Sequence, residues 1–223
     1  MNISAETIAA LRQYDSATVA NAIETFGVRP DPYGYTGPEL RCMLPDLGAM
    51  VGVAVTGMMA PRDPGDQDWR AGWLEFCQAI EDTPGDSVAV IAESPLWRFQ
   101  AALIGEVMST VMQSLGAVGC VTDGAVRDLE QIRALSFHCH AAGVIVSHGS
   151  MKFVECQQPV RLGRLTVRPG DLLHGDANGI VRVPAEIAAD VPAAAQRIMD
   201  REAEIMGEAR RPGFRVADMR RFY

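Results

Sequence analysis

The chain has 223 residues, of which 48% are hydrophobic and 22% are charged, as expected for a globular protein with a full hydrophobic core. Its formal net charge of −8 argues against nucleic acid or an anionic membrane as a partner. An acidic protein that binds an acidic substrate needs local arginine side chains or a metal ion to do so.

The cysteines favour a reducing compartment. The five cysteines are widely spaced and form no C-x-x-C pair, which indicates free thiols rather than a disulfide framework or a zinc knuckle. The N-terminal residues lack the cationic start and apolar core of a signal peptide. The longest apolar run, residues 50–60, is too short to cross a bilayer. We therefore expect a cytoplasmic protein that does not bind membranes.

The first half of the chain predicts two helices and then alternating strands and helices. Residues 4–27 carry a partial helical stripe that ends at Gly27, and Ser16 marks the start of a second helix. Residues 28–47 are rich in proline and glycine and predict a long loop. The elements expected next are a strand over 51–58, a helix over 73–80, a turn at 84–86 and a strand over 87–92.

The second half predicts further alternation and then a group of short strands. After Gly105 we expect a helix that ends at Gly116, with an apolar face of Val107, Met108, Val111, Met112 and Leu115. A strand over 118–122 follows, then a helix from Val126 with Leu129, Ile132 and Leu135 facing inward. The last elements expected are a strand near 143–147, short strands between 159 and 183, a helix from Pro184 to about Gly207, and a basic tail. This order predicts an α/β fold with a mixed sheet.

The segment 118–128 (VGCVTDGAVRD) carries the most informative pattern. It predicts a buried strand, a tight Asp-Gly turn and a helix whose first turn contains Arg127 and Asp128. Ligands of α/β folds collect at the carboxyl ends of strands. A carboxylate there could hold a divalent metal, and an arginine could pair with an anionic substrate. The alternative is a solvated arginine beside an aspartate that complements the helix dipole.

Gly105 and Glu106 form a second candidate site. Glu106 lies upstream of Arg127, with twenty residues between them. A glycine at a helix N-terminus leaves backbone N–H groups free for a carboxylate or an enolate oxygen. Glu106 would add a second carboxylate to the same pocket. The alternative is a glutamate in the first turn of an ordinary helix.

Other types of site have weaker support. His138 and His140 would share one face of a strand, but the histidine spacing gives no zinc cluster and favours structural roles. Lys152 is the sole lysine, and a strand-edge position is favoured over a Schiff-base role. The sequence contains no dinucleotide-binding, P-loop, nucleophile-elbow or zincin motif.

Several stretches together resemble one known family. They are residues 15–23 (DSATVANAI), 52–56 (GVAVT), 105–106 (GE), 119–128 (GCVTDGAVRD), 159–160 (PV), 167–171 (VRPGD) and 174–184 (HGDANGIVRVP). On these residues the chain resembles the RraA-like family, which includes 4-hydroxy-4-methyl-2-oxoglutarate/4-carboxy-4-hydroxy-2-oxoadipate aldolases. The resemblance covers about residues 10–205, and the Asp-Gly-x-x-Arg-Asp element with its upstream acid is its most specific part.

The resemblance implies a fold and an assembly. The fold would be a single swivelling-type α/β domain over residues 1–223, with central mixed β-sheets flanked by helices. It would have N-terminal helices over about 4–27 and a C-terminal helix and basic tail over about 184–223. The assembly would be a homotrimer or homohexamer with active sites between subunits, where Glu202 or Glu204 of a neighbouring subunit contributes.

The same resemblance implies roles for individual residues. Asp128 would bind Mg²⁺ or Mn²⁺, and Arg127 would act in catalysis by contacting the substrate and its enolate. Glu106 stands where relatives often have aspartate, and it would hold a water that shuttles protons. The substrate-binding residues implied are Gly105, Glu106, Val107, Met108 and Arg127.

The function implied is a divalent-metal-dependent lyase that cleaves 4-hydroxy-2-oxo acids by a retro-aldol reaction and releases pyruvate. Oxaloacetate decarboxylation is the expected side activity, because both reactions pass through the enolate of pyruvate. One alternative is a non-catalytic regulator that binds a ribonuclease or another protein. Another is a methyltransferase, although the chain lacks a glycine-rich loop for the methyl donor. Trp69, Trp73, Trp97 and the loop 29–47 are candidates for shaping the pocket, or for core or interface positions.

Overall fold

The computed structural model describes residues 3–30, 33–66, 68–95 and 98–222. The helices are α1 (Ala5–Leu11), α2 (Ser16–Glu24), α3 (Trp69–Glu81), α4 (Glu106–Ser114), α5 (Leu129–Ala134), α6 (Val191–Ala209) and α7 (Val216–Met219), with a 3₁₀ turn η1 (Pro45–Leu47). The strands are β1 (Arg41–Cys42), β2 (Met50–Pro61), β3 (Ser87–Glu93), β4 (Ala102–Ile104), β5 (Ala117–Thr122), β6 (Ala125–Val126), β7 (His138–Ala141), β8 (Gly143–Val144), β9 (Met151–Cys156), β10 (Val160–Leu162), β11 (Leu165–Val167), β12 (Leu172–Asp176) and β13 (Gly179–Val183).

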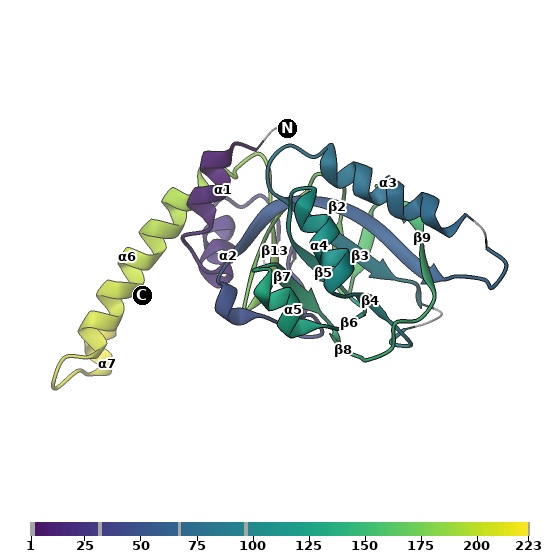
Figure 1. Ribbon diagram of the computed structural model, residues 1–223. Helices are drawn as coiled ribbons and strands as arrows, with labels where there is room; N and C mark the ends of the chain where they lie inside the picture. The colour runs from purple at the N-terminus through teal and green to yellow at the C-terminus, as the bar shows by residue number, and fades with distance from the viewer. Residues whose placement is uncertain (1–2, 31–32, 67, 96–97, 223) are drawn as a thin grey trace.

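A mixed sheet forms the centre of the fold (Figure 1). Its strand order is β1-β7-β5-β3-β2-β12-β13, and β9 pairs with β2 as well. Strands β2, β3, β5 and β7 run parallel, whereas β1, β9, β12 and β13 add antiparallel pairs. The twelve residues of β2 allow it to pair with β12 near its start and with β9 near its end. The expected α/β class with central mixed sheets and flanking helices is confirmed.

Both faces of the central sheet are covered, as the sequence of β3 requires. Every residue of β3 is buried, which is typical of a parallel strand between two layers. Ala89 and Ile91 belong to the core that α3, α4 and α5 complete, through residues such as Phe76. Val88 and Val90 face the opposite way and pack with the β10–β11 hairpin. The strands β4, β6 and β8 form a separate parallel sheet, and the candidate site lies where β4 and β6 end.

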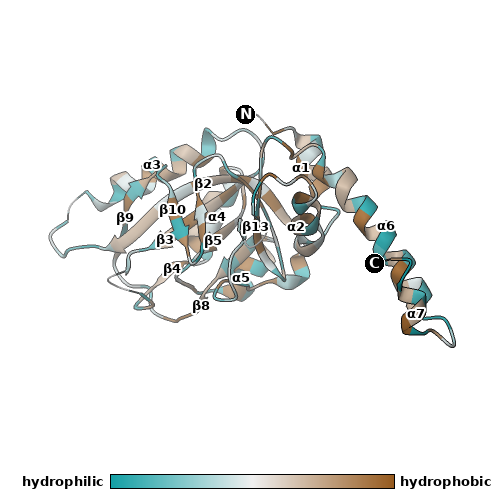
Figure 2. Cartoon of the chain, turned by 180° about the vertical axis from the view of Figure 1, so that it is seen from behind, coloured by the Kyte–Doolittle hydropathy of each residue, from teal (hydrophilic) through white to brown (hydrophobic). Residues whose placement is uncertain are grey.

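The N-terminal helices and the start of α6 form a second core against β12 and β13. The Asp15 side chain accepts a hydrogen bond from the Thr18 N–H at 2.9 Å and so caps α2, which explains why a second helix begins at Ser16. In α6, the buried residues Val191, Ala194 and Ala195 lie in the first turns. The rest of α6 projects from the body together with α7, and hydrophobic segments alternate with hydrophilic ones along it (Figures 1 and 2).

Two expected helix starts are wrong. Val126 does not begin a helix; it is buried in β6, pairs with β4, and α5 starts only at Leu129. Pro184 does not begin the last helix either, because residues 185–190 form turns and α6 starts at Val191. In both places buried contacts with distant segments override the local pattern.

Other expectations need smaller corrections. The apolar face of α4 excludes Val107, which is 75% exposed. β2 and α3 each extend beyond the expected ranges, and the strand expected near 143–147 is limited to Gly143–Val144. Among the helices of the described residues, none combines the length and apolar composition needed to cross a membrane.

Candidate active site at the start of α4

Gly105 connects β4 to α4 and opens the helix. It adopts an extended conformation (φ −147°, ψ −169°), and its carbonyl accepts the Ser109 N–H at 3.0 Å. The N–H groups that follow Gly105 have no acceptor within the helix, because the first turn has no preceding turn. They form a small positive region at the helix N-terminus. The expected start of this helix is therefore confirmed.

Arg127 and Asp128 lie between β6 and α5, beside β4. The Arg127 N–H donates to the Ile104 carbonyl at 3.0 Å, which ties this segment to the strand that precedes α4. Asp128 is in the left-handed region (φ 58°, ψ 40°), which non-glycine residues rarely occupy but aspartate tolerates better than most. Its carbonyl accepts the Ile132 N–H at 2.9 Å and so begins α5.

The two candidate segments meet at one carboxylate oxygen. Asp128 Oδ2 accepts the Glu106 N–H at 3.1 Å and lies 3.4 Å from Arg127 Nε. A Cβ atom on Gly105 would lie 2.6 Å from the same oxygen and 3.1 Å from Arg127 Nε. The glycine at 105 therefore permits this close approach, and any larger residue there would displace the Asp128 side chain. Two segments separated by twenty residues of sequence thus form one cluster, which we call the acid–arginine cluster (Gly105, Glu106, Arg127 and Asp128).

A cavity of about 430 Å³ lies against this cluster. Four of the expected substrate-binding residues line it: Gly105, Val107, Met108 and Arg127. The remaining lining comes mainly from β2, α3, β4 and β9 and their adjoining loops: Met59, Arg62, Trp69, Trp73, Ala102, Leu103, Ile104, His148, Gly149, Ser150, Met151, Lys152 and Phe153. Its volume falls in the range of about 300–1,000 Å³ typical of small-molecule sites.

Other expected site residues lie outside the cavity lining. The Glu106 side chain is exposed, and its contact with Asp128 is made by its backbone N–H. Asp128 stands beside the cavity with its side chain 32% exposed. Glu202 and Glu204 are exposed on the projecting part of α6.

The pocket-shaping candidates divide between the cavity and other regions. Trp69 and Trp73 line the cavity, whereas Trp97 lies outside the described residues. The described part of the loop packs elsewhere, since Tyr35 pairs with Val181 and Leu44 is in the core.

Asp128 is compatible with a hydrated divalent ion. Mg²⁺ keeps several waters in most proteins and takes only one or two carboxylates, with substrate oxygens completing its shell. The Asp128 carboxylate is partly exposed, and its contacts with the Glu106 N–H and with Arg127 Nε both use Oδ2. Across the described parts of the chain, no group of three or more His, Cys, Asp or Glu residues is placed to hold an ion. The donor set therefore suits a water-rich Mg²⁺ or Mn²⁺ site rather than a closed zinc site.

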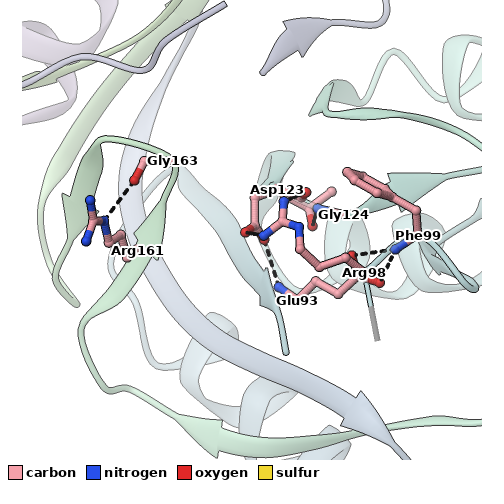
Figure 3. A network of polar contacts seen from close by, with 8 residues as sticks. Glu93, Arg98, Phe99, Asp123, Gly124, Arg161 and Gly163 are labelled. Atoms are coloured by element: carbon pink, nitrogen blue, oxygen red, sulfur yellow. Dashed lines mark hydrogen bonds and ion pairs between the residues drawn. The ribbon is translucent and has the colours of Figure 1, made fainter. Parts of the chain in front are cut away.

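A buried acidic network supports the segment that enters β4, and no pattern in the sequence predicts it (Figure 3). Asp123 accepts the Glu93 N–H at 2.8 Å and pairs with Arg98 Nη1 at 2.8 Å. The Glu93 carboxylate in turn accepts the Phe99 N–H at 3.0 Å. Burial raises the pKa of Glu93, and the nearby Asp123 charge adds to this effect. Asp123 was expected only as a turn residue, because nothing in the sequence points to a partner 25 residues away.

The histidines mostly contact the backbone of neighbouring elements. His140 Nε2 lies 3.0 Å from the Asp176 carbonyl, and His174 Nε2 lies 3.0 Å from the Tyr14 carbonyl. Burial lowers the pKa of both rings. His148 is the histidine that lines the cavity. Lys152 lies in β9, as the strand-edge alternative supposed, and pairs with Asp66 at the cavity wall.

A family model described as RraA-like, Aldolase/RraA, matches residues 16–182, which is more than half of the chain. The chain therefore belongs to the RraA-like family. One relative, from Halalkalibacterium halodurans and named "Putative 4-hydroxy-4-methyl-2-oxoglutarate aldolase", is 31% identical over 105 residues. That alignment covers 47% of this chain and 49% of the relative, so the match spans about half the length of that protein.

Solved structures share the fold across nearly the whole chain. A crystal structure of an uncharacterized protein from Pseudomonas syringae pv. tomato superposes with a TM-score of 0.78 at 23% identity, covering 100% of this chain and 96% of that one. Streptomyces coelicolor RraAS2, described as an unusual member of the RNase ES inhibitor RraA family, gives a TM-score of 0.70 at 20% identity. It covers 95% of this chain and 99% of that chain. At these identities the likeness concerns the fold alone.

Proposed function

We propose that the protein is a divalent-metal-dependent lyase that cleaves 4-hydroxy-2-oxo acids by a retro-aldol reaction and releases pyruvate. The observation that carries this proposal is the meeting of the Glu106 N–H, Arg127 and Asp128 at a single carboxylate oxygen beside a small-molecule cavity. Family membership supports it, since the matching family model covers aldolases by name.

The first turn of α4 would bind the substrate carboxylate. The Val107 and Met108 N–H groups lie at a positive helix end that lines the cavity, which suits an anionic group. Arg127 lines the same wall and adds a full positive charge close to the 2-oxo group. Together these groups would fix the orientation of the 2-oxo acid before any bond breaks.

Cleavage of the C3–C4 bond leaves an electron pair that becomes the enolate of pyruvate. Arg127 would stabilise the negative charge that develops on the C2 oxygen, an interaction that strengthens in the transition state. A divalent ion held by Asp128 would supply Lewis-acid stabilisation to the same charge. The exposed Glu106 carboxylate would hold a water that takes the proton of the 4-hydroxyl group and returns one to C3.

The assay that tests this function measures pyruvate released from 4-hydroxy-4-methyl-2-oxoglutarate, other 4-hydroxy-2-oxo acids and oxaloacetate. We expect turnover with Mg²⁺ or Mn²⁺ and its loss when a chelator is added. The proposal is wrong if none of these compounds is turned over with either ion.

Replacing the arginine provides the matched mutational test. Arg127→Ala should lower kcat by about 10²–10³-fold, the usual effect of removing one donor to an oxyanion. Arg161→Ala is the control, because Arg161 is exposed, lies outside the cavity lining and donates from Nε to the nearby Gly163 carbonyl at 2.9 Å (Figure 3). Equal activity of the two variants would remove Arg127 from the mechanism.

A protein-binding regulator is the second candidate, and one observation favours it. The projecting part of α6 and α7 exposes Met199, Met206 and Val216, which offers an apolar surface to another protein. Pull-down of a ribonuclease at physiological salt, together with no turnover of any 2-oxo acid, would favour this function over the lyase.

A further inference from the structure

The cavity beside the acid–arginine cluster has an aromatic wall formed by Trp69, Trp73 and Phe153. Trp69 and Trp73 lie one turn apart on α3 and so face the same side of the helix. The Trp73 ring stacks on Phe153 with centroids 5.8 Å apart, and Phe153 stacks on the buried Phe76 at 4.5 Å. Met59, Met108 and Met151 complete an apolar lining.

Two glycines allow α3 and β2 to pack closely against Phe153 of this wall. A Cβ on Gly72 of α3 would lie 2.6 Å from the Phe153 carbonyl oxygen. A Cβ on Gly57 of β2 would lie 2.8 Å from the Phe153 ring. Phe153 is thus enclosed by α3 and β2, whereas Trp69 and Trp73 remain partly exposed and present their rings to the cavity. The wall is pre-formed, which lowers the entropic cost of binding a flat apolar group.

The cationic side chains that line the cavity differ in their partners. Arg62, Arg127 and Lys152 line it, and no carboxylate does among the described residues. Lys152 is paired with Asp66, and the Arg62 guanidinium lies 4.9 Å from the centre of the Trp69 ring. The hydrogen bond from Lys152 lowers the pKa of Asp66, and the more distant Arg62 charge adds a smaller effect in the same direction. At the α4 end, Arg127 lies beside the helix N-terminus with Asp128 Oδ2 3.4 Å from its Nε, whereas the opposite wall is mainly apolar and aromatic.

We propose that the preferred substrates are 4-hydroxy-2-oxo acids that carry an aryl group at C4 in place of a second carboxylate. This inference rests on the proposed lyase function and names its substrate class. The carboxylate would lie at the start of α4 with Arg127, and the aryl ring would pack against Trp73 and Trp69. The Trp69 ring also contacts the Arg62 and Arg70 guanidinium groups, at 4.9 and 4.7 Å from its centre. A second carboxylate would meet mainly apolar and aromatic side chains at this wall, where Lys152 is already paired with Asp66.

The reaction balances for this class without any oxidant or reductant. The 4-hydroxyl group loses its proton, and its oxygen becomes the carbonyl oxygen of an aryl aldehyde. The C3–C4 bond breaks, and its electron pair remains on C3 as the enolate of pyruvate. Protonation of C3 then gives pyruvate.

Binding tests the aromatic wall independently of turnover. Calorimetry with Mg²⁺ compares 4-phenyl-2-oxobutanoate with 2-oxobutanoate, neither of which has the 4-hydroxyl group needed for cleavage. We expect the phenyl compound to bind at least about tenfold more tightly, because stacking adds to the buried apolar area. Trp73→Ala and Trp69→Ala should each reduce this preference about tenfold and leave the affinity for 2-oxobutanoate nearly unchanged.

Two further variants make the comparison specific. Leu74→Ala is the control, because Leu74 neighbours Trp73 on α3 but is 64% exposed and outside the cavity lining. Trp73→Phe keeps a flat ring and should restore part of the preference. Trp69→Ala keeps the test valid if Trp73→Ala fails to fold, since Trp69 does not belong to the Phe76 and Phe153 stack.

The outcomes separate this inference from the lyase function. Higher kcat/KM for 4-hydroxy-4-phenyl-2-oxobutanoate than for 4-hydroxy-4-methyl-2-oxoglutarate supports both proposals. Equal binding of 4-phenyl-2-oxobutanoate and 2-oxobutanoate, or a higher kcat/KM for 4-hydroxy-4-methyl-2-oxoglutarate, overturns the aryl preference but leaves the lyase standing. Tight binding of the phenyl compound without cleavage of any 2-oxo acid contradicts the lyase and, with it, the proposed substrate class.

Discussion

Gly105 is the residue on which the candidate site depends most. Its missing side chain lets the Asp128 carboxylate approach the start of α4. Gly105→Ala should shift the Asp128 and Arg127 side chains and lower kcat/KM by about 10²-fold, while the melting temperature changes little because the backbone angles suit alanine. Gly65→Ala is the control, since a Cβ there meets nothing within 4 Å. Equal activity of the two variants would show that the close approach has no functional role.

His138 provides a pH-dependent test at the residue scale. Burial, together with the nearby His140 and Arg12 charges, lowers its pKa to about 4 from an ordinary value of 6.5. The unfolded chain therefore binds a proton between these values that the folded chain does not, so stability is lost as the pH falls from about 6.5 to 4. His138→Gln should reduce the drop in melting temperature between pH 7.5 and 5.

Other histidines contribute to the decrease in melting temperature that remains in the His138→Gln variant. His140 and His174 also have lowered pKa values, and they contribute in the same direction. His148→Gln, which removes an exposed imidazole, is the control. If His138→Gln behaves like this control, then the lowered pKa of His138 does not contribute to stability.

The residues of the candidate site could be predicted from the sequence, because they belong to two short, specific segments, Gly105 with Glu106 and Arg127 with Asp128. Their contact at one oxygen could not, since it depends on the pairing of β4 with β6. The Asp123–Arg98 pair was missed for a similar reason: Arg98 lies on a loop without a periodic pattern. Sequence spacing shows which residues can share a helix face, but not which loops meet.

At the scale of elements, long periodic segments were predictable and short strands were not. α1, α2 and β3 follow capping and hydrophobic patterns that operate within a few residues. β4, β6 and β8 have two or three residues each and exist because they pair with one another. Because β6 pairs with β4, Val126 is part of a strand and α5 starts at Leu129, three residues after the expected position.

The packing of β9 against α3 should dominate the stability of the cavity region. Phe153 is 6% exposed and stacks on both Phe76 and Trp73. Phe153→Ala should lower the free energy of unfolding by about 3–5 kcal/mol, measured by denaturant titration. The neighbouring Val154 is 45% exposed, and Val154→Ala should have a much smaller effect. Similar losses for both variants would contradict the packing described here.

At the scale of the whole molecule, the projecting part of α6 requires an explanation. Met199 and Met206 are more than 40% exposed there, at 42% and 46%. We expect a homotrimer or homohexamer in which this part of the helix packs against a neighbour and brings Glu202 or Glu204 close to its site. Light scattering should give the mass of three or six chains, and Met199→Glu with Met206→Glu should reduce it. Leu74→Glu, on the exposed side of α3, is the control, and a monomer at micromolar concentration would contradict the assembly.

The proposed lyase depends on a divalent ion held at Asp128 during cleavage of a 4-hydroxy-2-oxo acid. The most direct measurement is the initial rate of pyruvate release with Mn²⁺, before and after chelation, for the wild type and Asp128→Asn. We predict metal-dependent turnover in the wild type and a loss of at least about 10²-fold in the variant, with its fold preserved. Turnover that survives both the chelator and the substitution, or no turnover at all, would contradict the account.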